Sequence, residues 1–549
     1  MWPLSLAAAV LAISEISVAA PTSGQANALE ARQALTPYAP VTVQCPAGNL
    51  VRPANGINSK EASYVSSRKS KADGSLASWL KKRGSFSTSS LPVVGFTSSG
   101  GGYRALLETA GVVQGFDIRD SNVGTSGVYQ GLTYEAGLSG GSWFLSSLAG
   151  NNWPTVSSLK TGLWENAFQN SLLLPANILS ASGLTQYVAT TTDITAKEAA
   201  GYDTTIVDPY GRLLSYQLLL GPDGGVNTRL SGLTTLSNFT AYNVPYPIIV
   251  DTAGFPDRGE CSPAIDGPIF EFHPYEYGSW DTGVSAFANT KYMGTDMTSG
   301  KPTNSLKCTQ RYDNLGYIFG TSSDIFPGFC GLLQPDNSTL PGILEDILPH
   351  DPALNDVFGI YPNPFYKYSR STLVSNDTEL TLADGGLAGQ NVPIWPFIQP
   401  ARTVNVLIAN DNSADTTDNF PNGTEIRQTY LNAQAVGLKK MPFIPDVSTF
   451  VSQGLNKRAT FFGCGQTGTV FIVYLPNVNY TYPSNQPTSK VQYSKAETDA
   501  MIANGVQIAT QNDNAGWPLC LACAIGNQNG RAPTTKGCNA CFTKYCYRQ

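Results

Sequence analysis

The strongest constraint on the fold comes from one short segment in which two glycines flank a serine. Gly137, Ser139 and Gly141 form the only G-x-S-x-G pattern in the chain. An apolar run at 131–138 leads into the pattern, and residues 143–148 have the spacing of an amphipathic helix. Flanking glycines permit a turn too tight for side chains. The segment therefore predicts a strand, a sharp turn with the serine at its tip, and a helix, and the serine is either a nucleophile or part of a structural turn.

Other short apolar runs alternate with stretches of helical character, as expected for buried strands of an α/β sheet. These runs are residues 91–97, 247–250, 380–383 and 404–409. Loops rich in Gly, Pro, Asn and Ser separate them, and no linker, repeat or charge block divides the chain after Cys45. We therefore expect one large α/β domain with long insertions over residues 45–549, closed by a cysteine-rich segment at 515–549.

The first twenty residues have the pattern of a secretory signal peptide. Residues 4–13 are apolar apart from one serine, small residues follow at 17–20, and the run is too short to span a bilayer. Residues 21–44 lack periodicity and are expected to form a mobile or processed segment. The last residues form no hydrophobic tail, so no lipid-anchor signal is expected. We predict a secreted protein without a transmembrane segment.

Ten cysteines and five N-x-S/T sequons agree with export. The cluster from Cys520 to Cys546 contains two C-x-x-C pairs, which favour zinc in a cytosolic protein and disulfides in an oxidising compartment. For a secreted chain we expect disulfides and no metal. The sequons, where we expect N-glycans, are Asn238, Asn337, Asn376, Asn422 and Asn479.

The charge balance narrows the class of partner. The net charge is -6 and the isoelectric point is near 5.1. Nucleic acid is therefore not an expected partner, because phosphate binding requires a basic face. A neutral lipid surface needs no cationic patch, so the composition is compatible with a lipid substrate at a micelle or membrane surface.

A serine nucleophile requires a general base, and histidine is scarce in this chain. Only His273 and His350 are present, each beside a proline in an apparent loop, where a structural or surface role is expected. If neither acts, a carboxylate must be the base. Asp-Gly-Gly occurs at Asp223, where turn chemistry explains it, and at Asp384, which follows the apolar run 380–383. We therefore prefer Asp384 as the base of a Ser-Asp dyad.

A second glycine-rich turn follows the apolar residues 93–96. Residues 100–102 are three consecutive glycines, whose exposed N–H groups can point at one anion, and Arg104 comes one turn into the helix predicted after them. The spacing fits neither the dinucleotide-binding fingerprint nor the P-loop. This turn is a candidate oxyanion site, and a purely structural glycine turn is the alternative.

These three motifs together resemble those of the fungal lysophospholipase family, also called phospholipase B, which is related to cytosolic phospholipase A2 and more distantly to patatin. The resemblance is carried by residues 99–105, 137–143 and 384–386 and extends from about Cys45 to Cys546. It implies a patatin-like layered α/β catalytic domain. It implies neither a cofactor nor a calcium requirement.

The resemblance further implies a role for each motif. Ser139 would be the nucleophile and Asp384 its base, Gly101 and Gly102 would supply oxyanion N–H groups, and Arg104 would bind the substrate phosphate. The implied reaction is hydrolysis of fatty-acyl esters of lysophospholipids and phospholipids through an acyl-enzyme, with transacylation as a side activity. The alternatives are a secreted neutral-lipid esterase or lipase, and a surface glycoprotein whose glycine turns are structural.

Overall fold

The computed structural model describes residues 36–171, 181–328 and 354–548. The expected signal peptide at residues 1–20, the sequon Asn337 and His350 lie outside the described residues. The described chain forms two compact units. The serine unit comprises Asn55–Glu165, Thr234–Val250 and Ala388–Gln549, and the aspartate unit comprises Met1–Ala54, Asn166–Leu233 and Asp251–Leu387.

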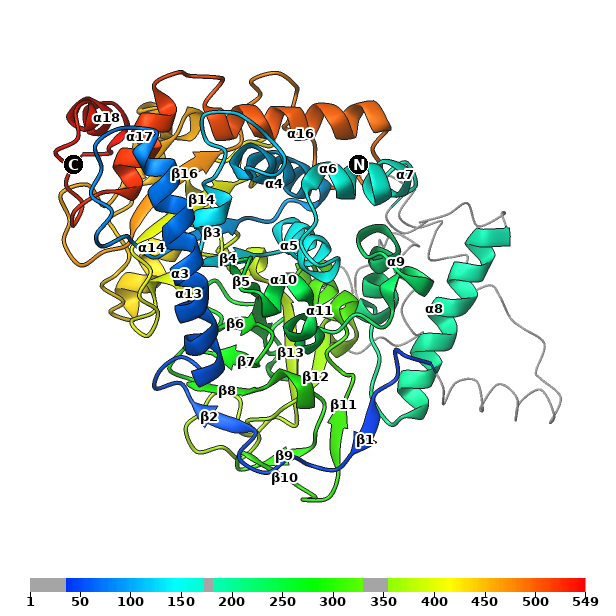
Figure 1. Cartoon of the computed structure of the whole chain (residues 1–549). Coiled ribbons are helices and arrows are strands. Elements are labelled where there is room, and N and C mark those ends of the chain that lie inside the picture. Colours follow the sequence, from blue (N-terminus) through cyan, green and yellow to red (C-terminus); the bar gives the residue numbers. More distant parts are fainter. Residues whose placement is uncertain (1–35, 172–180, 329–353, 549) are drawn as a thin grey trace. The chain divides into compact units, whose positions relative to one another are not determined.

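The serine unit is built on a largely parallel sheet with the order β15-β16-β14-β3-β4-β5 (Figure 1). All adjacent pairs from β16 to β5 are parallel, and β15 is antiparallel to β16. The central strands are buried along their whole length, as expected for parallel strands covered on both faces. The strands are β3 (Val94–Ser98), β4 (Tyr134–Gly137), β5 (Tyr246–Gly254), β14 (Val406–Asp411), β15 (Thr460–Phe462) and β16 (Phe471–Pro476).

These strands include the apolar runs expected from the sequence, and their register places three strand ends together. Ser98 of β3 is level with Gly137 of β4 and with Asn410 of β14. The loops that follow these carboxyl ends therefore emerge at one edge of the sheet, where ligands bind in open parallel sheets.

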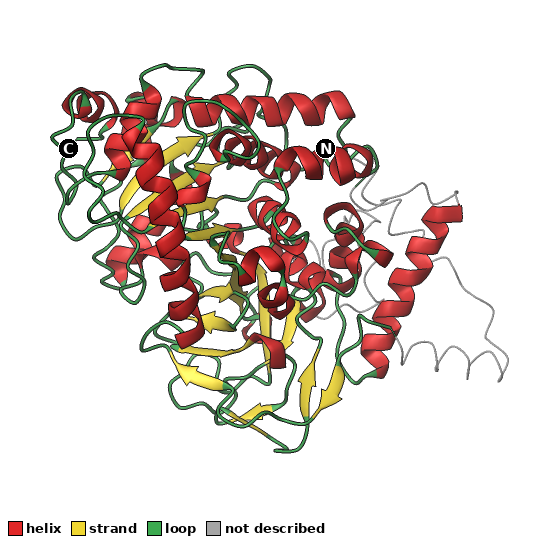
Figure 2. Cartoon of the chain, in the orientation of Figure 1, coloured by secondary structure: helices red, strands yellow, loops and turns green. Residues whose placement is uncertain are grey.

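Helices cover this sheet (Figure 2). They are α3 (Ser59–Lys81), α4 (Gly102–Phe116), α5 (Gly140–Gly150), α6 (Val156–Leu159), a π-helical turn (Lys160–Trp164), α10 (Ser237–Thr240), α13 (Trp395–Ile398), α14 (Thr424–Ala435), α15 (Val447–Ser452), α16 (Lys495–Thr510), α17 (Trp517–Ile525) and α18 (Cys538–Tyr545). The short helix α7 (Glu165–Ala167) leads into the aspartate unit.

Helices α4 and α16 lie side by side in backbone contact (Figure 1). A Cβ atom added to Gly111 of α4 would lie 2.6 Å from the Cα of Gly505 of α16. Helix α16 begins at a capping box, in which the Ser494 hydroxyl accepts from the N–H of Glu497 and the Glu497 carboxylate accepts from the N–H of Ser494. The close packing therefore holds the middle of α4 against α16.

Helix α5 contains the expected helix at 143–148, but the prediction that this helix is amphipathic is wrong. Every residue from Gly140 to Ala149 is buried. The helix packs against α4 and the sheet, so it has no solvent face to carry a polar stripe.

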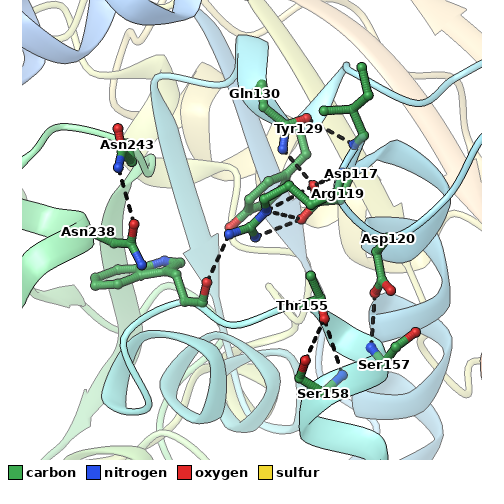
Figure 3. A network of polar contacts seen from close by, with 12 residues as sticks. Asp117, Arg119, Asp120, Tyr129, Gln130, Thr155, Ser157, Ser158, Asn238 and Asn243 are labelled. Atoms are coloured by element: carbon green, nitrogen blue, oxygen red, sulfur yellow. Dashed lines mark hydrogen bonds and ion pairs between the residues drawn. The ribbon is translucent and has the colours of Figure 1, made fainter.

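The loop between α4 and β4 is held by a polar network (Figure 3). The Asp117 carboxylate accepts from Nη2 of Arg119 at 2.7 Å and from Nε2 of Gln130 at 2.6 Å. Nη1 of Arg119 also donates to the carbonyl of Trp153 at 3.1 Å. These bonds fix the chain that leads into β4 and tie it to the segment that follows α5.

In the aspartate unit the strands are mostly antiparallel. The second part of β5 pairs with β13, which pairs with β12, and a further series runs β6-β7-β8-β2 beside β5. Two small two-stranded sheets, β1-β11 and β9-β10, complete the strands. The strands are β1 (Val41–Val43), β2 (Val51–Pro53), β6 (Ile269–Phe272), β7 (Glu276–Ser279), β8 (Ala286–Asn289), β9 (Met297–Thr298), β10 (Lys301–Pro302), β11 (Cys308–Gln310), β12 (Gly359–Pro362) and β13 (Glu379–Asp384), and the helices are α8 (Ala181–Ala199), α9 (Val207–Leu218) and α11 (Leu315–Thr321).

The cysteine-rich segment forms disulfides, as the sequence predicts. Two bridges, Cys520–Cys541 and Cys523–Cys538, join α17 to α18. A third bridge, Cys464–Cys546, ties the end of the described chain to the segment that follows β15. A further bridge, Cys45–Cys308, lies in the aspartate unit. In the described part of the chain, no helix has both the length and the apolar character needed to cross a membrane.

Candidate active site

Ser139 lies at a tight turn between β4 and α5, as the sequence predicts. Its φ of 52° and ψ of -125° are uncommon for a residue with a side chain. The turn depends on its flanking glycines, since a Cβ atom added to Gly141 would lie 2.7 Å from Oγ of Ser98. The Ser139 carbonyl accepts from the N–H of Trp143 at 2.9 Å and from Oγ of Ser142 at 2.7 Å, which anchors the serine to the first turn of α5.

The three-glycine loop lies directly beside this turn. A Cβ atom added to Gly100 would lie 2.7 Å from the Cβ of Ser139, and one added to Gly140 would lie 2.8 Å from the backbone N of Gly102. Gly101 and Gly102 have positive φ values, 137° and 60°, which favour glycine. Within the described residues, neither of their N–H groups donates to a protein acceptor. The loop therefore offers two amide donors next to the serine.

Arg104, in the first turn of α4, is buried with 1% of its surface exposed. Its Nε donates to the carbonyl of Asn412 at 2.9 Å and its Nη1 to the carbonyl of Gln486 at 2.6 Å. Its Nη2 has no hydrogen-bond partner among the described residues, and Arg104 forms no ion pair with their carboxylates. One side of the guanidinium is thus anchored to backbone, while Nη2 is buried without a hydrogen-bond partner among the described residues.

Burial lowers the pKa of Arg104 to about 10, and Tyr493 and the nearby acids Asp411 and Asp415 oppose this decrease. The guanidinium is therefore charged at neutral pH. Burial, followed by the charge of Asp411, raises the pKa of Asp415 to about 7. The surroundings of Arg104 therefore become more negative as the pH rises through neutrality.

Asp384 is the last residue of β13 in the aspartate unit, at the strand end where the sequence placed it. It is 3% exposed, and its Oδ1 accepts from the N–H of Gly386 at 2.7 Å. A 3-10 turn, Gly385–Ala388, follows directly. The structure brings the predicted serine, glycine loop and arginine together in the serine unit, while Asp384 belongs to the aspartate unit.

Two buried carboxyl groups beside Asp384 are missing from the sequence predictions. Asp251 on β5 is the cross-strand partner of Asp384, and the carbonyl of Asp324 accepts from the N–H of Asp384 at 3.0 Å. Burial raises the pKa of both Asp251 and Asp324 well above the usual range. The signal available in the sequence was an aspartate inside the otherwise apolar run that forms β5.

The remaining candidates have structural surroundings. Asp223 accepts from the Tyr216 hydroxyl and lies 3.2 Å from Nη2 of Arg212, in a turn where its φ is 50°, which agrees with the structural interpretation of this Asp-Gly-Gly. His273 is fully buried between β6 and β7, where its carbonyl accepts from Oγ1 of Thr290 at 2.8 Å. A surface role for His273 is therefore wrong.

Comparison with known proteins identifies the family and the fold. Residues 94–549 match the family model described as the lysophospholipase catalytic domain. Lysophospholipase 2 of Aspergillus fumigatus is 37% identical, with 93% of each chain covered, and lysophospholipase 1 of Saccharomyces cerevisiae is 35% identical, with 93% of this chain and 83% of the yeast protein covered. The solved structure of human GIVD cytosolic phospholipase A2 matches with a TM-score of 0.66 at 16% identity, over 90% of this chain and 73% of the human chain. This likeness confirms the expected layered α/β fold.

Proposed function

Because the chain belongs to the lysophospholipase family, and is therefore a carboxylic-ester hydrolase, we propose that it hydrolyses fatty-acyl esters of lysophospholipids and phospholipids through Ser139 and Asp384. One observation carries the proposal: Ser139 lies against Gly100, the first residue of the three-glycine loop. The N–H groups of the next two glycines, Gly101 and Gly102, have no acceptor among the described residues. A nucleophile and two amide donors therefore lie together at the edge of the sheet where the parallel strands end. Acyl transfer requires this arrangement.

In the proposed mechanism, Asp384 accepts the hydroxyl proton as Ser139 attacks the acyl carbonyl carbon. The N–H groups of Gly101 and Gly102 stabilise the oxyanion, each contributing about 3 kcal/mol in comparable sites. The alcohol product takes the proton from Asp384 as it leaves; it is a glycerophosphodiester from a lysophospholipid and a lysophospholipid from a phospholipid. Water then attacks the acyl-enzyme and gives its proton to Asp384, which returns it to Ser139 as the fatty acid is released. Attack by a second lysophospholipid in place of water gives transacylation.

We assign the substrate phosphate to Arg104. Two of its nitrogens are used by backbone carbonyls, and the buried Nη2 without a partner among the described residues and the full positive charge suit a phosphate oxygen. The assignment separates a phospholipid hydrolase from a neutral-lipid esterase, since only the former gains from a buried cation.

Two further features of the chain, its domain organisation and its export, belong to the proposed function. We propose that residues 45–549 act as one catalytic domain, because the family match over 94–549 includes residues of both units and β5 runs from one unit into the other. We also propose secretion, with residues 1–20 as the signal peptide and N-glycans on the exported chain. The disulfides support this, because they persist in oxidising compartments.

The described sequons differ in exposure. Asn376 and Asn479 are exposed, whereas Asn238 and Asn422 are partly buried. The amide nitrogen of Asn238 donates to the carbonyl of Asn152 at 2.8 Å. The Oδ1 of Asn238 accepts from Asn243 at 3.2 Å (Figure 3). We therefore expect fuller glycan occupancy at Asn376 and Asn479, to be measured by mass spectrometry of the protein from a secreting host.

Release of fatty acid from lysophosphatidylcholine by purified variants tests the mechanism. We expect Ser139→Ala and Asp384→Asn each to lower kcat by at least about 10³-fold while the thermal unfolding midpoint stays close to that of the parent. Asp223→Asn, in the other Asp-Gly-Gly, is the matched control and should keep full kcat. Near-normal turnover by either of the first two variants would contradict the dyad.

A further inference from the structure

The side chain of Asn391 binds both backbone polar groups of Gly100. Its Nδ2 donates to the carbonyl of Gly100 at 3.3 Å, and its Oδ1 accepts from the N–H of Gly100 at 3.1 Å. The backbone carbonyl of Asn391 also accepts from that N–H, at 3.2 Å. The two residues are 291 positions apart in the sequence, and both belong to the serine unit.

Asn391 is itself held by two further groups. Its backbone N–H donates to the Glu425 carboxylate on α14 at 2.7 Å, and its Nδ2 donates to Oγ of Ser413 at 2.8 Å. The two Gly100 bonds assign the amide orientation, because the N–H of Gly100 can only donate and its carbonyl can only accept. The side chain is therefore fixed where it meets the glycine loop.

This contact sets the direction of the neighbouring amide. The carbonyl of Gly100 and the N–H of Gly101 belong to one planar trans peptide group, so they point in opposite directions. A bond that holds the Gly100 carbonyl therefore also fixes the Gly101 N–H. Without it, a peptide between two glycines rotates at little steric cost and can turn its carbonyl oxygen toward the serine.

The contact also explains which amides remain for the substrate. The N–H of Gly100 is used by Asn391, whereas those of Gly101 and Gly102 have no acceptor among the described residues. The bonds between Asn391 and Gly100 lie next to the nucleophile. A Cβ atom on Gly100 would lie 2.7 Å from the Cβ of Ser139 and closer still to Oδ1 of Asn391.

We propose that Asn391 is a positioning residue of the oxyanion site, which aims the Gly101 N–H at the oxyanion through the Gly100–Gly101 peptide. The inference rests on the proposed function, since it assigns a role within that reaction. Asn391 touches neither the substrate nor the reacting atoms in this role, and it acts only through the loop.

Two substitutions at position 391 test the role. Asn391→Ala removes both side-chain bonds, and Asn391→Asp keeps the acceptor for the Gly100 N–H but places a carboxylate oxygen against the Gly100 carbonyl. With lysophosphatidylcholine, we expect kcat to fall about 10²-fold to 10³-fold in both variants, as for loss of one oxyanion donor, and KM to change less than about threefold.

A second readout separates positioning from general structural support. A fatty-acyl trifluoromethyl ketone forms a tetrahedral oxyanion on the serine, so its inhibition constant should rise in proportion to the loss of kcat/KM. Asn504→Ala is the matched control, because Asn504 is a buried asparagine of the same unit that bonds to Glu108 and to the carbonyl of Val478 instead of to the glycine loop. It should lower the unfolding midpoint and leave kcat and inhibitor binding unchanged.

The outcomes are distinguishable. Parental kcat and inhibitor binding in folded Asn391→Ala and Asn391→Asp overturn the positioning role, whereas activity retained by Ser139→Ala overturns the proposed function itself. If both variants at position 391 fail to fold, Ser413→Ala provides the milder change, since it removes one acceptor that orients Nδ2. A threefold to tenfold loss of kcat, with inhibition weakened to match, is expected for Ser413→Ala, and no loss refutes the proposal.

Discussion

Adding one methyl group at Gly100 tests the contact between the glycine loop and the nucleophile. The φ of Gly100 does not lie in the left-handed region, so alanine fits the backbone there, but the space is already occupied. The new Cβ would lie 2.7 Å from the Cβ of Ser139 and closer still to Oδ1 of Asn391, so alanine displaces the side chain that holds Gly100 as well as the serine. Carbon atoms pack at about 3.5–4.0 Å, so the loop and the serine must separate by about 1 Å.

That displacement predicts the size of the effect. A misplacement of about 1 Å at a reacting group costs about 10²-fold in rate, or about 3 kcal/mol of transition-state stabilisation. Overpacking costs about 1–3 kcal/mol of folding stability. We therefore expect Gly100→Ala to fold, with a lowered unfolding midpoint, and to lose about 10²-fold in kcat/KM.

The assay is fatty-acid release from lysophosphatidylcholine, with thermal unfolding measured on the same preparation. Gly74→Ala is the matched control, because a Cβ atom at this position of α3 would meet no atom of the described residues within 4 Å. It should keep full activity and gain up to about 1 kcal/mol of stability from its helix position. If Gly100→Ala is as active as Gly74→Ala, the loop and the serine do not depend on each other as argued.

Three further predictions concern the substrate, the pH dependence and the disulfides. Arg104→Ala should lower kcat/KM for lysophosphatidylcholine at least about tenfold more than for an uncharged aryl ester, and equal losses would remove the phosphate role. Burial raises the pKa of Glu135 on β4 from 4.5 to about 7, so ionisation weakens the fold progressively between pH 4.5 and 7. Glu135→Gln should therefore gain about 3 kcal/mol in unfolding free energy at pH 8 and nothing near pH 4, and an equal gain at both values would contradict this reading. Replacing Cys464 and Cys546 by serine opens a loop with a sequence separation of 82, so calorimetry should show a loss of about 4 kcal/mol, and an unchanged unfolding midpoint would show that this bridge does not restrain the unfolded chain.

The elements around Ser139 could be predicted because their causes are local. A tight turn between strand and helix needs glycines within two residues of its tip, so the pattern itself specifies the backbone. The same holds for the strand that ends at Asp384 and for the glycine loop after β3. Disulfide use in the C-terminal segment also followed from the cysteine spacing and from the oxidising compartment that the first twenty residues predict.

Contacts between distant segments decided the rest. No local pattern indicates that Asn391 binds Gly100, that Asp251 lies opposite Asp384, or that α5 has no solvent face, because each depends on which strands and helices become neighbours. The amino-acid sequence by itself therefore determined that a serine would stand at the tip of a strand–turn–helix and that a glycine loop would follow another strand. Only the tertiary structure decided which side chain holds that loop, since hydrogen-bond partners far apart in the chain meet only when the sheet assembles.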